Sequence, residues 1–179
     1  MDFKLKGKKA FISASTSGIG LEAARILLNE GMTVYINGRS EKTVKKAVEY
    51  LKNEINGSQI KGIVADFLEQ GQVNNLLSSL KDVDVLINNV GIYSSTSFFN
   101  TPKKTWYDQF QVNVMSGVTL TKHFLEGMIA RNWGRIIFIS SECVYLAPID
   151  LISYSSTKAA LHSLSRGICL LYTSDAADE

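Results

Sequence analysis

Short apolar and β-branched runs alternate along the chain with longer segments whose apolar residues recur at helical spacing. The short runs predict strands over Lys9–Ser13, Thr33–Asn37, Ile60–Ala65, Val83–Asn88 and Arg135–Ser140. The longer segments predict helices over Ile19–Glu30, Glu41–Asn53, Glu69–Leu80 and Trp106–Arg131, and one more that begins near Ser153 and passes Leu164. This alternation predicts a parallel sheet covered by helices on both faces, which is a doubly wound α/β domain.

Composition limits the class of protein. The chain has 179 residues, of which 45% are hydrophobic and 20% charged, as in one globular domain. Neither a membrane-spanning run nor a cleavable apolar leader is evident, and a net charge of +2 does not indicate nucleic acid binding. Two cysteines offer no disulfide framework, which suits a reducing cytosol. Together these observations lead us to expect a cytoplasmic protein with no membrane or nucleic acid partner. His123 and His162 lack partners at metal-ligand spacing, so no metal is expected.

A nucleotide-binding turn is predicted directly after the first strand. Glycines at such a turn let the backbone approach a pyrophosphate, and the following helix presents free N–H groups and a partial positive charge. The alternative is an ordinary tight turn that needs glycine only for its geometry. The residues predicted to contact the cofactor here are Ala14, Ser15, Thr16, Ser17, Gly18, Ile19 and Gly20.

The ends of the next three strands carry further candidates. Arg39 follows the second strand, where an acidic residue would bind the ribose hydroxyls of NAD, and it can instead pair with a 2′-phosphate. NADP is therefore predicted, with NAD and a solvated arginine as the alternatives. Asp66, followed by Phe67, can bond the adenine amino group or cap the next helix. Asn89 and Gly91 end the fourth strand at the ligand-binding edge, or form a plain turn.

Tyr154 and Lys158 are four residues apart and share one face of the last predicted helix. A free phenol has a pKa of about 10, too high for efficient proton exchange near neutral pH. A neighbouring ammonium favours the phenolate and lowers that pKa. Such pairs are common in helices, but beside a nucleotide-binding turn this one indicates carbonyl reduction.

Five segments in one order resemble the motifs of the short-chain dehydrogenase/reductase family, in its single-domain oxidoreductase branch. They are Ser13–Gly20, Asn88–Gly91, Asn113, Ser141 and Tyr154–Lys158, within a likeness that extends over residues 5–167. Among relatives, the chain looks most similar to 3-oxoacyl-acyl-carrier-protein reductase-like enzymes. Two positions depart from the pattern: Ala14 stands where the family has glycine, and Val90 where it has alanine.

The resemblance implies a Rossmann fold and hydride transfer between a nicotinamide and a ketone or secondary alcohol. In that reading Tyr154 is the general acid, Lys158 holds the nicotinamide ribose, and Ser141, with Ser140 as the alternative, bonds the carbonyl oxygen. Asn113 would hold a water in a proton relay, or have only a structural role. The small-molecule partner would be a carbonyl compound or an alcohol. The alternatives are an NAD-dependent alcohol or sugar dehydrogenase, and an inactive nucleotide-binding fragment.

The resemblance also implies a homodimer or homotetramer, formed through the helices at Trp106–Arg131 and Ser153–Leu164. It leads us to expect an incomplete nucleotide-binding domain over residues 1–168 that lacks the last strands of the family. Residues 169–179 match nothing in the family pattern and look like translated sequencing adapter. The fifth strand would then be an exposed apolar edge, so we expect the 179-residue chain to be poorly soluble and inactive.

Overall fold

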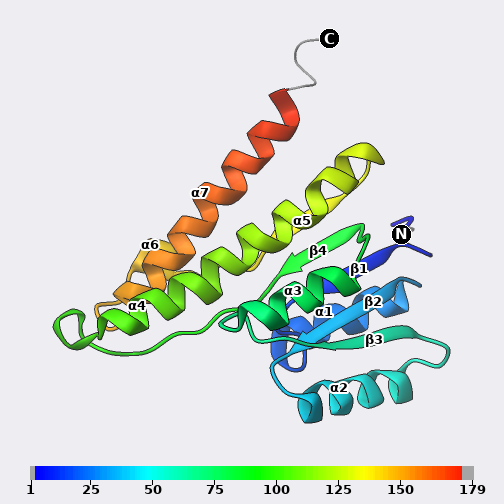
Figure 1. The fold of residues 1–179 in the computed structure, drawn as a ribbon, viewed down its shortest axis with the longest axis horizontal. Coiled ribbons are helices and arrows are strands. Elements are labelled where there is room, and N and C mark those ends of the chain that lie inside the picture. Colours follow the sequence, from blue (N-terminus) through cyan, green and yellow to red (C-terminus); the bar gives the residue numbers. More distant parts are fainter. Residues whose placement is uncertain (1–2, 175–179) are drawn as a thin grey trace. The chain divides into compact units, whose positions relative to one another are not determined.

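The fold is built on a sheet of five strands within residues 3–174, the part of the chain that the computed structural model describes (Figure 1). The strands are β1 (Lys9–Ile12), β2 (Thr33–Gly38), β3 (Gln59–Val64), β4 (Val85–Asn88) and β5 (Arg135–Phe138). Their order is β3-β2-β1-β4-β5, and β1 pairs in parallel with β2 and β4, as β2 does with β3. This order is that of a doubly wound nucleotide-binding fold, which confirms the predicted fold class.

Helices follow most of the strands. They are α1 (Gly18–Asn29), α2 (Glu41–Glu54), α3 (Gln70–Ser79), α4 (Lys103–Phe110), α5 (Ser116–Ala130), α6 (Cys143–Leu146) and α7 (Ile152–Ser174). A 3₁₀ turn η1 (Phe98–Asn100) and a π-helical turn η2 (Gln111–Met115) lie before and after α4. In the described part of the chain, no helix is long and apolar enough to cross a membrane.

The chain divides into two compact units, each treated separately below. The first consists of Met1–Val90 and Thr119–Ile137, and the second of Gly91–Val118 and Phe138–Glu179. In the first unit Ala10, Phe11 and Ile12 are all fully buried, because β1 has helices on both of its faces. On one face Phe11 and Leu86 pack against side chains of α3 and α5, among them Leu76, Leu120 and Phe124.

One expected helix proved to be three consecutive segments. The pattern over Trp106–Arg131 predicts a single helix, whereas α4, η2 and α5 follow one another with a π-helical turn between them. The turn contains Asn113, whose side chain bonds the backbone of Ile92. An extra residue in the turn re-aims a side chain, and such bulges occur frequently at functional sites.

Two further expectations concern segment ends. Asp66 was predicted to bond the adenine amino group or, alternatively, to cap the helix after β3. The alternative is wrong, because the N-cap of α3 is Glu69 and the Asp66 carboxylate accepts the Leu68 N–H at 3.0 Å. The carboxylate is thus used in a local turn before the helix begins. Of the tail expected to be non-native, residues through Ser174 continue α7, and residues 175–179 lie outside the described part of the chain.

Among the glycines of the first unit, Gly20 lies closest to the backbone of another segment. A Cβ added there would lie 2.8 Å from Ser15 Cα and 2.9 Å from the Ala14 carbonyl oxygen. Real Cβ atoms avoid such distances, and backbone cannot yield as a side-chain tip can. Gly71 on α3 is a matched helical glycine, since a Cβ added there would meet nothing within 4 Å.

We therefore predict opposite effects of two glycine-to-alanine substitutions. Gly20→Ala should lower the free energy of unfolding by about 1–3 kcal/mol through overpacking. Gly71→Ala should raise it by about 0.4–1 kcal/mol, because alanine restricts the unfolded chain. Urea unfolding of the two variants measures both changes. Equal shifts in the two transition midpoints would contradict the close approach at Gly20.

Candidate functional site

In the first unit, the turn between β1 and α1 is held by the end of β4. The Asn89 amide donates to the carbonyl oxygens of Ser13 at 3.0 Å and Ala14 at 2.9 Å. In return, Ser13 Oγ accepts the N–H groups of Asn89 at 2.9 Å and Val90 at 3.0 Å. Asn89 stays a predicted cofactor contact, and its amide nitrogen supports the turn that carries the other candidates.

A second asparagine, not singled out from the sequence, holds the turn from the other side. Asn37 at the end of β2 is 1% exposed, and its Oδ1 accepts the Ala14 N–H at 3.1 Å while its amide nitrogen donates to the Ala65 carbonyl at 3.1 Å. Ser15 Oγ accepts the Asn37 N–H at 2.9 Å and donates to the Ile12 carbonyl at 2.6 Å. The signal in the sequence was a polar residue closing an otherwise apolar strand.

Ala14 adopts a left-handed backbone conformation, with φ of 48°. Glycine takes this conformation freely, whereas a Cβ makes it cost about 1–2 kcal/mol. This departure from the family pattern therefore places a strained residue in the turn. The hydrogen bonds from Asn37 and Asn89 on either side of Ala14 hold the residue in place.

The start of α1 offers donors to an anion. The N-cap residue Ser17 makes no side-chain capping bond, and the first turn carries no acidic residue. The first N–H groups of a helix have no partner within it, and the helix dipole places positive potential there. Gly18 has φ of 55°, and Ile19 beside it is 66% exposed. A pyrophosphate fits this helix end.

Arg39 lines a cavity of about 390 Å³ in the first unit, together with Thr16, Ser40, Thr43 and Asp66. Within residues 3–174 the Arg39 guanidinium has no hydrogen bond and no ion pair, so it is available to an anionic ligand. Phe67 is different: its side chain is 4% exposed and belongs to the core, so only its backbone can face a ligand. The residues present thus fit a nucleotide with an extra phosphate on its adenosine end.

The second unit brings together Gly91, Asn113, Tyr154 and Lys158. Asn113 is 2% exposed, and its amide forms a two-way bridge with Ile92: Oδ1 accepts the Ile92 N–H at 2.7 Å, and Nδ2 donates to the Ile92 carbonyl at 2.9 Å. Nδ2 also donates to Thr157 Oγ1 at 2.9 Å, and Thr157 in turn donates to the Tyr154 carbonyl at 2.7 Å. Asn113 therefore links η2 to the first turns of α7.

Lys158 is a buried amine, only 3% exposed. Its Nζ donates to the Ile139 carbonyl at 2.7 Å and lies 5.6 Å from the centre of the Tyr154 ring, so the expected shared helix face is present. A Cβ added to Gly91 would lie 3.4 Å from this Nζ. Burial lowers the pKa of the Lys158 ammonium, because removal from water penalises the charged form.

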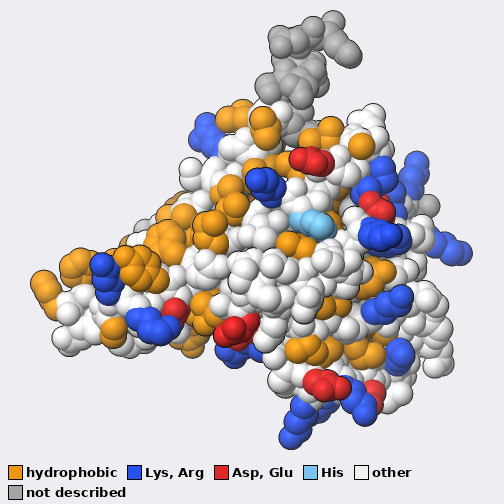
Figure 2. Space-filling view, viewed as in Figure 1, with side chains coloured by type: hydrophobic (Ala, Val, Ile, Leu, Met, Phe, Trp, Pro, Cys, Tyr) orange, Lys and Arg blue, Asp and Glu red, His pale blue; other side chains and the backbone are white. Residues whose placement is uncertain are grey.

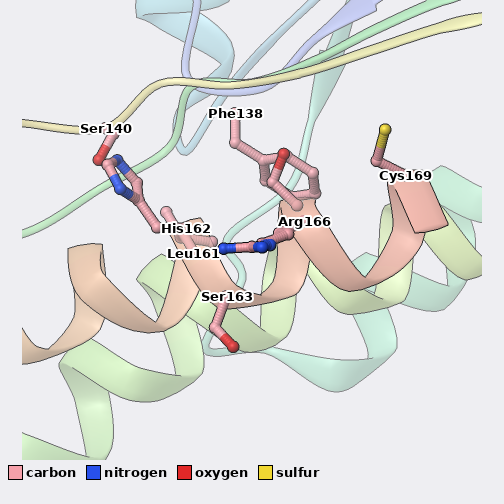
Figure 3. A pocket seen from close by; sticks show the side chains of 8 residues that line it. Phe138, Ser140, Leu161, His162, Ser163, Arg166 and Cys169 are labelled. Atoms are coloured by element: carbon pink, nitrogen blue, oxygen red, sulfur yellow. The ribbon is translucent and has the colours of Figure 1, made fainter.

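Ser141 precedes the short helix α6, and its Oγ accepts the Cys143 N–H at 3.2 Å. Among the described residues, no hydrogen bond joins Ser141 to Tyr154 or the Tyr154 hydroxyl to Lys158. The alternative Ser140 has a buried Oγ without a partner in residues 3–174. Ser140 lines a separate cavity of about 700 Å³ with Phe138 and side chains of α7, where the His162 ring extends towards it (Figure 3). Tyr154 and Lys158 do not line that cavity.

Comparison with known proteins gives a consistent result. The family model for short chain dehydrogenase matches residues 8–175. An uncharacterized oxidoreductase of Bacillus subtilis, YvaG, is 38% identical over 97% of this chain and 66% of its own length. The 3-oxoacyl-[acyl-carrier-protein] reductase FabG of Aquifex aeolicus is 30% identical over 94% of this chain and 69% of its own.

Among solved structures, L-sorbose reductase from Gluconobacter frateurii, complexed with NADPH and L-sorbose, superposes with a TM-score of 0.91 at 28% identity. The match covers 98% of this chain and 68% of that one. The chain spans about two thirds of the length of the curated relatives it matches.

The buried amine yields a prediction about pH. Because the Lys158 pKa is lowered in the folded state, the unfolded chain binds more protons between the folded pKa and the unfolded value of about 10.4. The penalty for burying the charge is thus full below the folded pKa and is relieved as pH rises through this range. Lys158→Met should therefore lose stability relative to wild type as pH rises from neutral to about 10.

Urea unfolding at several pH values measures this slope, which does not depend on the lost bond to the Ile139 carbonyl. Lys45→Met removes an exposed lysine of α2 and serves as the control, for which we expect wild-type pH dependence. If the free energies of unfolding of Lys158→Met and wild type changed equally with pH across the whole range, burial would not penalise the ammonium.

Proposed function

The chain belongs to the short-chain dehydrogenase family, and on that premise we propose that the whole protein is an NADP-dependent oxidoreductase acting on ketones or secondary alcohols. The observation that carries the proposal is Lys158, a buried ammonium beside Tyr154 and Gly91. Burying a charged amine costs several kcal/mol of stability, and such groups gather where chemistry needs a shifted proton equilibrium.

Bound NADPH would supply a hydride, with its electron pair, to the carbonyl carbon of the substrate. Tyr154 would donate its phenolic proton to the carbonyl oxygen, so that the ketone becomes an alcohol and the phenolate is left behind. The Lys158 ammonium would stabilise that phenolate by its charge. A proton from solvent must then return to Tyr154, and the reverse sequence oxidises the alcohol.

Ser141 would bond the carbonyl oxygen as negative charge develops there. Its Oγ accepts the Cys143 N–H, which orients the oxygen and leaves the hydroxyl proton for the substrate. Asn113 would act mainly by position, since its amide is committed to Ile92 and Thr157. A relay water behind Lys158 would therefore bind backbone near η2 rather than this amide.

The cofactor would bind through the first unit. The uncapped start of α1 would hold the pyrophosphate, and Arg39 would pair with the 2′-phosphate that distinguishes NADP from NAD. The NADPH complex of the similar L-sorbose reductase supports this choice. A sugar is one substrate class that likeness to L-sorbose reductase favours, and a 3-oxoacyl thioester is favoured by likeness to FabG. Cytoplasmic location and a homodimer or homotetramer complete the proposal.

Removing the Tyr154 hydroxyl tests the proposed role of Tyr154 as the general acid. Tyr154→Phe should lower kcat by about 10²–10⁴, the usual contribution of a general acid, while NADPH binding persists. Initial rates of NADPH oxidation with a ketone substrate measure kcat. Titration with NADPH, followed by fluorescence, measures cofactor binding. Tyr107→Phe changes an exposed tyrosine of α4 and should leave both unchanged. A Tyr154→Phe enzyme with wild-type kcat would overturn the proposal.

Arg39 sets the expected choice of cofactor. Arg39→Ala should raise KM for NADPH by about tenfold or more, because a charge-assisted bond contributes roughly 1.5–3 kcal/mol. KM for NADH should stay unchanged, since NADH lacks the 2′-phosphate. Lys45→Ala removes a positive charge on α2, outside the cavity that contains Arg39, and controls for net charge. A parallel rise in both KM values would argue for NAD or for a structural role of Arg39.

A further inference from the structure

An exposed tyrosine lies beside the proposed acid in the second unit. The rings of Tyr93 and Tyr154 are 6.0 Å apart and meet edge to face at 63°. Tyr93 is 71% exposed, and its hydroxyl has no partner among residues 3–174. An aromatic ring that gains so little from burial contributes little to folding, yet this ring lies beside that of the proposed acid.

The backbone around Tyr93 is clamped on both sides. On one side, Ile92 is bridged by the two hydrogen bonds of Asn113. On the other, Ser95 Oγ donates to the Asp150 carboxylate at 2.5 Å, and the Thr96 N–H donates to the Asp150 carbonyl at 2.9 Å. Holding an exposed loop in one conformation costs entropy, and such pre-organisation is typical of ligand contacts.

Asp150 also fixes this segment against the loop that leads into α7. It lies four residues before Tyr154, and the following Leu151 starts the helix by accepting the Ser155 N–H at 2.8 Å. The same residue therefore sets the position of the Tyr93 segment and of the turn that presents Tyr154.

The two segments that flank the rings, residues 91–102 and 143–157, are largely apolar, although Lys103 and Lys104 of α4 and the buried Lys158 directly follow them. Residues 91–102 contain no charged side chain, and residues 143–157 contain only Asp150, which is bonded to Ser95. Tyr145, Leu146 and Ile149, between Ser141 and Tyr154, are 81%, 69% and 85% exposed. Figure 2 shows hydrophobic side chains around the α4 end of the second unit, with Lys or Arg side chains among them. These two segments thus present no cation that would bind a carboxylate or phosphate of a substrate.

Resting on the proposed function, we propose that Tyr93 is a specificity-determining residue that selects uncharged ketones with an aromatic or extended apolar substituent. The substituent packs on the exposed face of the Tyr93 ring while the carbonyl oxygen meets Tyr154. Asp150 is a positioning residue that holds Tyr93 in place. Hydroxyl-rich sugars gain little from such a ring face, so they are the disfavoured class.

The test compares acetophenone with L-sorbose in NADPH-dependent reduction by the whole protein. The wild type should reduce acetophenone with the higher kcat/KM. Tyr93→Ala should lower kcat/KM for acetophenone by about tenfold or more, chiefly through KM, with less than a twofold change for L-sorbose. Tyr93→Phe keeps the ring and should retain the wild-type preference.

Two more variants complete the design. Ser95→Ala removes one bond to Asp150 and should shift the preference in the same direction as Tyr93→Ala but less. Tyr107→Ala removes an exposed ring of α4 and should change neither substrate. A wild type that prefers L-sorbose or reduces neither compound, or a Tyr93→Ala enzyme affected equally with both, would overturn the inference. Turnover that survives Tyr154→Phe would instead overturn the proposed function.

Discussion

Backbone groups at the ends of buried strands must find hydrogen-bond partners, and the candidate site depends on how this chain satisfies that constraint. The side-chain amides of three asparagines provide such partners. Asn37 and Asn89 hold the backbone of the turn after β1, and Asn113 bridges both backbone groups of Ile92. The amides of Asn37 and Asn113 donate and accept at once, and the Asn89 amide donates to two carbonyl oxygens, so each side chain makes two bonds to backbone. The loops that carry the proposed chemistry are thereby held in one conformation.

Two features that cost stability lie within the candidate site. Ala14 adopts a left-handed conformation that suits glycine, and Lys158 buries an ammonium that donates to the Ile139 carbonyl. Backbone strain and buried charge both reduce stability, and they persist where the surroundings hold them. The asparagine bonds supply that support next to Ala14, and the Ile139 carbonyl supplies it at Lys158. Such a distribution is typical of a site kept for chemistry rather than for folding.

For three residues predicted to contact the cofactor, the structure shows which neighbours their side chains contact. Asn89 and Phe67 were predicted to contact the cofactor, and the structure places the Asn89 amide on a turn and the Phe67 ring in the core. Asp66 was predicted to bond the adenine amino group or to cap the next helix, and that helix begins four residues later, at Gln70, with Glu69 as its N-cap. Each residue lies just beyond the end of a strand, β3 or β4. Which neighbour a short polar side chain bonds depends on φ, ψ and contacts that spacing alone does not specify.

Periodicity and motif order by themselves determined the strand–helix alternation, the parallel sheet, the family and the pairing of Tyr154 with Lys158, because these depend on local spacing along one helix or strand. Only the tertiary structure decided the π-helical turn at Asn113, the support of Ala14 by Asn37 and the contact between Tyr93 and Tyr154. These features join residues that are far apart in the sequence. Asn113 bonds Ile92, 21 positions away, and Tyr154 contacts Tyr93, 61 positions away. Contacts across such separations follow from packing and hydrogen-bond geometry, which no local pattern encodes.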